Sequence, residues 1–211
     1  TRKESSAASD VYKRQRQDSL ATALEDLGDN RWDADMAAGT LTFTSNADSA
    51  RQLVTRAHLV ATIAPGPRSL LWAWAHPQGD PAGVAAQLRD YGVQHGIVEL
   101  SETELPFPAD AAGDAEWIAA AAHTVGTVAV ELTGRAPYYL APVGGGTYAV
   151  FLLDAPLPPL TVASAAIVLP RILSTVALPD ARTAVWDAAR LAGWNLCLLY
   201  TSDAADDSLR V

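Results

Sequence analysis

The chain has 211 residues, of which 49% are hydrophobic and 18% charged, and its formal net charge at pH 7 is −9. This acidic balance argues against binding to nucleic acid or to an anionic membrane surface, because both need a cluster of basic residues. The single cysteine excludes a disulfide framework within the chain, and no run approaches the ~20 apolar residues of a membrane-spanning helix.

The two ends of the chain resemble translations of one synthetic DNA adapter. Residues 5–15 (SSAASDVYKRQ) can be encoded by an adapter of the kind used in transposase-based sequencing libraries. The reverse complement of the same string, shifted by one base, encodes Cys197–Asp206 (CLLYTSDAAD). We therefore assign residues 1–15 and 197–211 to adapter-derived, non-native sequence, and expect residues 16–196 to be native and truncated at the carboxyl end.

Setting both ends aside changes the residue inventory but not the charge. Cys197, the only cysteine, and both lysines, Lys3 and Lys13, lie in the adapter stretches, which hold equal numbers of acidic and basic residues. The remaining segment is acidic, and its alanine and arginine content with no lysine is typical of a GC-rich bacterial gene. Its visible start, residues 16–29, is charged and amphipathic and does not look like a signal peptide. We therefore expect a cytoplasmic bacterial protein, and we interpret the chain as a metagenomic fragment of it.

The first half of the native segment predicts a helix, four strands and a second helix. Helical spacing predicts a helix over 18–27, and strict alternation predicts a hairpin of strands at 32–36 and 40–44. Strands at 57–64 and 69–75 follow across short turns, which favours an antiparallel meander. Helical spacing returns over 81–91, with Gly92 expected to end the helix.

The second half repeats this order. Asp114 is expected to cap a helix over 115–125 that ends at Gly126. The elements expected after it are strands at 127–133, 138–141 and 147–153, a helix at 161–175 with Pro170 as a kink or break, and a last helix between Asp180 and Gly193. We predict an α+β fold, an antiparallel meander sheet packed by helices. Residues 16–196 are expected to form one domain, with two similar halves, 16–110 and 111–196, as the alternative.

The segment Trp72–Pro77 (WAWAHP) is the most distinctive candidate for a ligand or partner surface. On a strand, Trp72 and Trp74 would share one face, either as a recognition surface or as core beneath a helix. His76 would end that strand, either as a functional group or as an ordinary turn residue. These three residues are the predicted ligand or partner site.

Signatures of catalysis and metal binding are missing from the sequence. The four histidines, His58, His76, His95 and His123, include no pair with the usual spacing of metal ligands, so we expect no metal and no cofactor. No known nucleophile motif is present, and no catalytic residue is assigned. The alternative is a small, hydrolase-like enzyme that acts near the end of the fourth strand with His76 and Asp80.

Five segments of the chain, in this order, resemble a bacterial family of unknown function, domain-of-unknown-function family 6882. The matching stretches are Trp32–Asp35, Leu41–Phe43, Trp72–Pro77, Leu88–Gly96 and Gly144–Thr147. The family pattern has asparagine at the position of His76, which weakens a catalytic role for that side chain. The resemblance implies a shared fold and further sequence beyond Leu196, but no activity, substrate or cofactor.

Together these features predict a non-catalytic, cytoplasmic binding module. The reasons are its acidic composition, its strand-end tryptophans and the missing catalytic set. Its partner is expected to be a protein, in a capping role like that of immunity-type or chaperone-like proteins, or a small molecule, but not nucleic acid or a membrane. A small-molecule sensor that uses Trp72 or Trp74 is a third hypothesis.

Overall fold

The computed structural model describes residues 2–158, 161–175, 181–191 and 194. The chain divides into two compact units, Lys13–Pro159 and a smaller one made of Thr1–Tyr12 with Leu160–Val211. The predicted cap Asp180, the predicted stop Gly193 and the stretch 197–211 lie outside the described residues.

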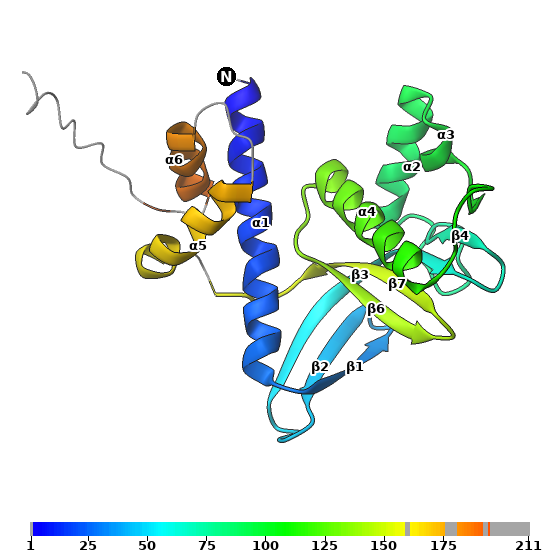
Figure 1. Ribbon diagram of the computed structural model, residues 1–211, viewed down its shortest axis with the longest axis horizontal. Helices are drawn as coiled ribbons and strands as arrows, with labels where there is room; N and C mark the ends of the chain where they lie inside the picture. Colours follow the sequence, from blue (N-terminus) through cyan, green and yellow to red (C-terminus); the bar gives the residue numbers. More distant parts are fainter. Residues whose placement is uncertain (1, 159–160, 176–180, 192–193, 195–211) are drawn as a thin grey trace, which may run out of the picture. The chain divides into compact units, whose positions relative to one another are not determined.

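The larger unit contains the whole described sheet (Figure 1). The elements through residue 158 are, in chain order, α1 (Arg2–Leu27), β1 (Asn30–Asp35), β2 (Thr40–Ser45), β3 (Gln52–Ala64), β4 (Ser69–Trp72), α2 (Val84–His95), α3 (Val98–Ser101), β5 (Glu104–Pro106), α4 (Ala115–Thr133), β6 (Tyr138–Gly144) and β7 (Thr147–Asp154). The smaller unit contains α5 (Val162–Thr175) and α6 (Ala181–Leu191). The predicted α+β class, with an antiparallel sheet packed by helices, is confirmed.

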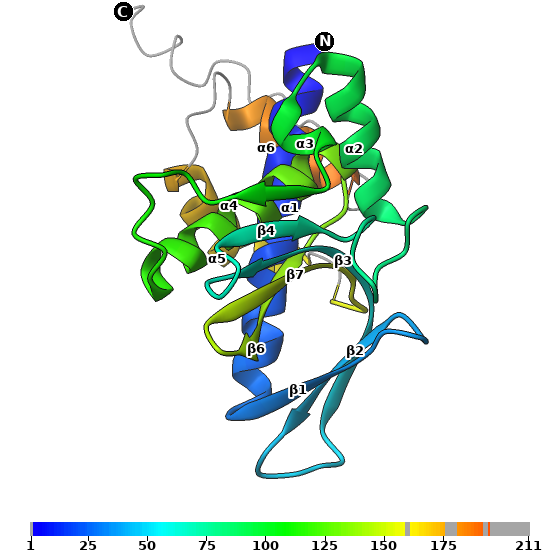
Figure 2. The same ribbon diagram turned by 90° about the vertical axis from the view of Figure 1, so that its right-hand side faces the viewer.

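The sheet is organised around the long strand β3 (Figure 2). Among the described residues it has seven strands, and every pairing is antiparallel. Arg56 pairs with both Thr40 of β2 and Asp154 of β7, and Ala61 pairs with both Trp72 of β4 and Val150 of β7. Since a strand has two edges, β2 and β4 share one edge of β3, and β7 lies on the other. The meander β1–β5 is therefore completed by the hairpin β6–β7, which pairs with its central strand.

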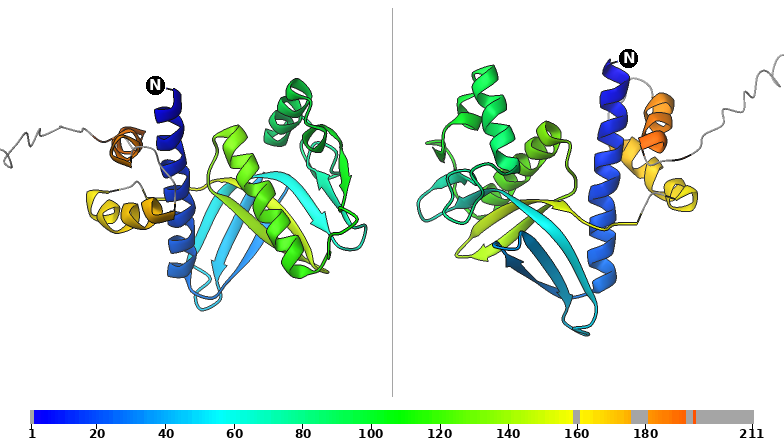
Figure 3. Two further views of the ribbon diagram at one scale, coloured as in Figure 1. Left: turned by 45° about the horizontal axis from the view of Figure 1, so that its top comes forward. Right: turned by 180° about the vertical axis from the view of Figure 1, so that it is seen from behind.

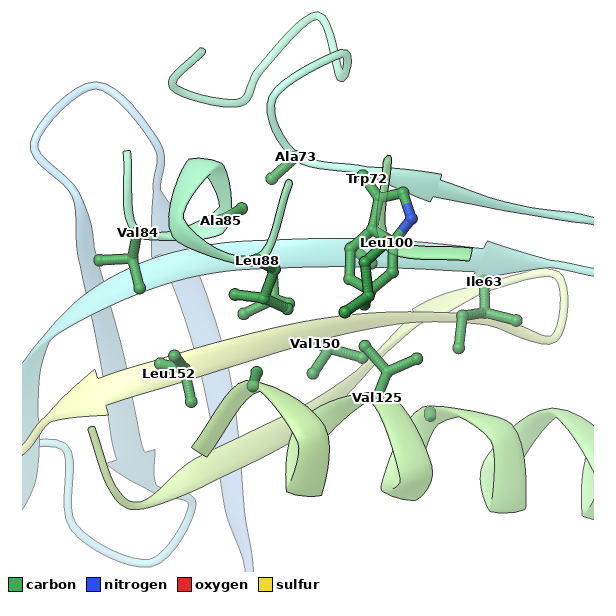
Figure 4. Packing of buried hydrophobic residues seen from close by; sticks show 14 of the residues in the cluster. Ile63, Trp72, Ala73, Val84, Ala85, Leu88, Leu100, Val125, Val150 and Leu152 are labelled. Atoms are coloured by element: carbon green, nitrogen blue, oxygen red, sulfur yellow. The ribbon is translucent and has the colours of Figure 1, made fainter. Parts of the chain in front are cut away.

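Each face of the sheet buries its own hydrophobic cluster. Along β7, Val150 and Leu152 join a cluster with α2, α3 and α4, whereas Phe151 and Leu153 join a cluster with α1. This division follows from the period of two along a strand, which directs neighbouring side chains to opposite faces. Figure 3 shows α4 lying across its face of the sheet, and Figure 4 shows Leu88 and Val125 packed near Val150.

The predicted strand at 127–133 is wrong, because α4 continues through these residues to Thr133. Helical spacing puts Ala122, Val125 and Ala129 on the buried face, so tertiary packing outweighs the β preference of the threonines and valines here. Gly126 does not end the helix. A Cβ atom at this position would lie 2.5 Å from Cδ2 of Tyr138, so the glycine permits close packing of the tyrosine ring.

The predicted stop at Gly92 is wrong for the same reason. Gly92 lies inside α2, where an added Cβ would lie 2.6 Å from Cβ of Leu100. The helix ends one turn later at Gly96, whose φ of 68° is in the left-handed region that favours glycine.

The fourth strand is shorter than predicted, since β4 ends at Trp72. The backbone then turns, with the amide of Ala75 bonded to Trp72 O and the amide of His76 bonded to Ala73 O. Trp74 and His76 therefore lie in this turn and not on the strand. The connection that follows α2 also contains a short strand, β5, which pairs with β4.

Helix α1 begins at Arg2 instead of Asp18. Residues 2–15 contain no glycine or proline, so nothing in them interrupts the helix. The adapter assignment concerns the origin of these residues and stays a prediction. In the smaller unit, Pro170 lies within the continuous helix α5, and Val11, Ala165, Leu169 and Ile172 form a separate cluster.

Candidate functional site

Trp72 and Trp74 are part of the core and not of the surface. They are 3% and 8% exposed, and their rings stack with centroids 5.1 Å apart and an interplanar angle of 9°. Trp72 Nε1 donates a hydrogen bond of 3.0 Å to the backbone oxygen of Glu99. The buried Nε1 of Trp74 has no partner among the described residues. Both indoles thus have the core position that was one of the two alternatives, and neither presents an open ring face.

His76 lies half-buried in the turn after β4. Its Nδ1 accepts a 3.1 Å hydrogen bond from the backbone N–H of Gln78. Burial lowers the pKa of His76 because it disfavours the imidazolium form. Both observations favour a neutral ring with its proton on Nε2. This is the geometry of a histidine that stabilises a turn.

Asp80 is exposed in the same loop and has a different partner. Its Oδ1 accepts a 2.9 Å hydrogen bond from the backbone N–H of Ala82. Among the described residues, the side chains of His76 and Asp80 are not bonded to each other. Asp80 lines a cleft to which His76 does not contribute.

This cleft has a volume of about 380 Å³ and lies against the middle of β3. Three segments form its wall: the β1–β2 turn at Met36–Gly39, the stretch Arg56–Leu59 of β3, and residues of the loop 78–84 before and at the start of α2. Cavities of about 300–1,000 Å³ are the usual size for small-molecule sites. We call this feature the β3 cleft.

A network of charged side chains fixes the imidazole that lines the β3 cleft. His58 Nε2 lies 3.0 Å from Asp154 Oδ2, and Arg135 Nη1 lies 2.9 Å and 3.0 Å from the two carboxylate oxygens. Partial burial alone would raise the pKa of Asp154. The hydrogen bond with His58 and the charge of Arg135 outweigh this effect, so the pKa is lowered and the carboxylate stays ionised.

Arg56 is the second polar residue from β3 in the cleft wall. It pairs in register with Asp154 of β7, so the two side chains leave the same face of the sheet. Both oxygens of Asp154 are already bonded to His58 and Arg135. Among the described residues, the exposed guanidinium of Arg56 has no hydrogen-bond or ion-pair partner.

A family model, described as a family of unknown function (DUF6882), matches residues 4–156. The chain belongs to the DUF6882 family. This confirms the family resemblance inferred from the sequence, while the bacterial origin and the adapter assignment stay predictions. No curated protein and no solved structure matches the chain significantly.

Of the residues that line the β3 cleft in this DUF6882 chain, the sequence had suggested a functional role for Asp80 alone. His58, Arg135 and Asp154 are far apart in sequence and meet only because β3 pairs with β7 and the α4–β6 connection lies beside them. The one available signal was the position of Arg56 and His58, the two basic residues of β3, which are two residues apart.

Three further observations concern the rest of the described residues. A second cavity, of about 330 Å³, is lined mainly by apolar and tyrosine side chains of α1, α4, β6 and β7, with His123 Nδ1 2.9 Å from the Tyr138 hydroxyl. Within the described part of the chain, no group of three or more potential ligands could hold a metal ion. In the same residues, no helix has both the length and the apolar character needed to cross a membrane.

Proposed function

We propose that this DUF6882 chain is a non-catalytic binding module that binds a small molecule in the β3 cleft. The observation that supports this most directly is the cleft itself, a concavity of about 380 Å³ with a fixed imidazole in its wall. Because His58 is held by Asp154 before any ligand arrives, little side-chain freedom is lost on binding. Two tightly packed glycine positions in the neighbouring loop, Gly79 and Gly83, support the same idea of a preformed wall.

The composition of the cleft wall favours binding over catalysis. The lining residues provide no serine, threonine or tyrosine hydroxyl, no cysteine thiol and no lysine amine, the side chains that most often act as nucleophiles. The competing hypothesis, a hydrolase-like enzyme using His76 and Asp80, requires these two side chains to act on one substrate. Their separate hydrogen-bond partners give it no support.

A variant in which a bulky side chain fills the β3 cleft tests the proposal. In Ala38→Trp, a large side chain is placed on an exposed lining position of the β1–β2 turn. Ala50→Trp is a matched control, because each of these exposed alanines donates its backbone N–H to a nearby aspartate, Asp35 or Asp48, and Ala50 does not line the cleft.

The two variants and the wild-type chain are titrated with a panel of sugars, nucleosides, amino acids and organic acids, with binding followed by calorimetry. We expect Ala38→Trp to weaken binding at least tenfold and Ala50→Trp to leave it unchanged. Equal affinity for both variants would place the ligand elsewhere, and no binding by any compound would contradict the proposal. Retained binding in the double variant His76→Ala, Asp80→Ala would exclude a joint role of these two residues in recognition.

A cytoplasmic location in a bacterial cell belongs to the same proposal. The lack of cysteine in residues 16–196 means that this segment needs no oxidising compartment to fold. Fractionation of cells that express the chain from its own genomic locus tests this location, and recovery from the periplasm or the medium would contradict it.

A further inference from the structure

We infer that the ligand of the β3 cleft has an oxyanion group, a carboxylate or a phosphate, and that Arg56 binds this group. The inference rests on the proposed function and specifies the class of ligand.

Arg56 differs from the other arginines of residues 16–158 because its guanidinium has no partner in the described residues. The others bond to backbone oxygens, to asparagine or to aspartate: Arg16 to Ala155, Arg31 to Asn46, Arg51 to Asp26, Arg68 to Ala111, Arg89 to Asp90 and Arg135 to Asp154. Within the part of the chain that the structure describes, Arg56 is also the only arginine that lines the β3 cleft.

The structure explains why the guanidinium of Arg56 has no hydrogen-bond or ion-pair partner among the described residues. The nearest carboxylate along the ladder, Asp154, is directly opposite Arg56, but His58 and Arg135 occupy both of its oxygens. Asp80, a carboxylate that lines the cleft itself, uses Oδ1 to accept the amide of Ala82. In the described residues, neither of these carboxylates is bonded to Arg56, although the chain as a whole has a net charge of −9.

An oxyanion is the chemical group that complements this arrangement best. A guanidinium donates two parallel hydrogen bonds to a carboxylate or a phosphate, and such charged pairs are stronger than neutral ones. With a neutral ligand, the N–H groups of the Arg56 guanidinium would be left to form hydrogen bonds with water. The fixed His58 provides a second polar group from the same strand, two residues away on the same face.

Matched probes test the inference. Glutarate is compared with its neutral diamide, glutaramide, and glycerol 3-phosphate is compared with glycerol, each titrated into the full chain by calorimetry. We expect at least one anion to bind at least tenfold more tightly than its neutral counterpart. The glutarate and glycerol 3-phosphate titrations show whether the preferred group is a carboxylate or a phosphate.

Variants that remove a positive or a negative charge from the cleft wall test the same inference, because they should change the affinity for an anion in opposite directions. Arg56→Gln is expected to weaken binding of the anion at least tenfold, whereas Arg56→Lys, which keeps the charge but loses the planar fork, is expected to weaken it less. Asp80→Asn keeps the oxygen that accepts the Ala82 amide and removes the negative charge, so binding is expected to strengthen by roughly two- to fivefold. Arg31→Gln, an exposed strand arginine outside the cleft, is the control and is expected to leave affinity unchanged.

The results separate this inference from the proposed function. If neutral compounds bind as well as the anions, or if Arg56→Gln and Arg31→Gln have equal effects, the oxyanion inference is overturned. In that case Ala38→Trp still decides whether the β3 cleft is the binding site. If neither the anions nor the wider panel bind, both the inference and the proposed function are overturned.

Discussion

Gly79 is a position where a single methyl group is expected to disturb the cleft wall. A Cβ atom there would lie 1.8 Å from the backbone oxygen of Ala73, which is part of the tight turn after β4. We predict that Gly79→Ala lowers the free energy of unfolding by about 2 kcal/mol or more, because a backbone atom must move to make room.

Gly66 provides the matched control for this substitution. It also lies in a turn, but an added Cβ would meet nothing within 4 Å and its φ is outside the left-handed region. Gly66→Ala should change the free energy of unfolding by no more than about 0.5 kcal/mol. Urea denaturation of both variants tests the pair, and similar values for the two would contradict the packing described for Gly79.

The two stacked tryptophans are predicted to respond differently to loss of the indole nitrogen. Trp72→Phe leaves the backbone oxygen of Glu99 without its donor, whereas Trp74→Phe removes an N–H that has no partner in the described residues. Both lose ring volume, so the difference isolates the hydrogen bond. Trp72→Phe should cost about 1 kcal/mol more than Trp74→Phe in the free energy of unfolding. The reverse order in denaturation experiments would refute this assignment.

The lowered pKa of Asp154 predicts that the free energy of unfolding depends on pH. Its pKa is lower in the folded state than the ordinary value of 3.8, so the folded state favours the ionised form. The ionised Asp154 therefore stabilises the folded state at pH values above the pKa that this carboxyl has in the unfolded chain. This stabilisation is lost as the pH falls through the pKa that it has in the folded chain. The difference in free energy of unfolding between wild type and Asp154→Asn should therefore shrink between pH 5 and pH 3. A constant difference over this range would contradict the network.

At the level of elements, the start of α4 depends on one side chain. Asp114 accepts a 2.9 Å hydrogen bond from the backbone N–H of Trp117, as the sequence predicted for a helix cap. We expect Asp114→Ala to lower the free energy of unfolding by about 1 kcal/mol, because the first turn loses its acceptor. Asp110→Ala, which removes an exposed carboxylate from the preceding loop, should have no measurable effect. Equal losses in thermal or urea unfolding would show that charge, not capping, matters here.

The sequence pattern predicted a helix or strand correctly where residues within or next to that element determine it. The β1–β2 hairpin was predicted from alternation around Gly39, and its ladder pairs Trp32 with Phe43 as alternation requires. The errors occurred where a distant residue decides the outcome. Gly92 and Gly126 look like helix stops in sequence, but each lies inside a helix and makes room for a side chain from another segment.

At the level of the whole molecule, the sheet topology explains why the β3 cleft was not predicted. The sequence suggested two successive groups of strands but did not indicate that β7 pairs with the middle of β3. That pairing brings Asp154 beside Arg56 and His58. The tryptophan segment was recognised as unusual, yet nothing local distinguishes a buried indole stack from a surface one.

Residues 16–158 are expected to fold without the rest of the chain. Both large hydrophobic clusters, including Leu20 and Leu27 of α1, lie within residues 16–158. A chain limited to 16–158 is expected to unfold cooperatively and to keep slow amide exchange in β3 and β7. Uniformly fast exchange in these strands would show that residues outside this range are needed for the fold.

Backbone amide chemical shifts recorded during titration with glutarate or glycerol 3-phosphate, whichever binds more tightly, test the central claim most directly. A ligand in the β3 cleft should perturb the amides of Met36–Gly39, Arg56–Leu59 and residues 78–84, and Arg56→Gln should reduce these changes severalfold at the same subsaturating concentration. Perturbations confined to the second cavity, near Leu20 and His123, or no perturbation by either compound, would contradict the account.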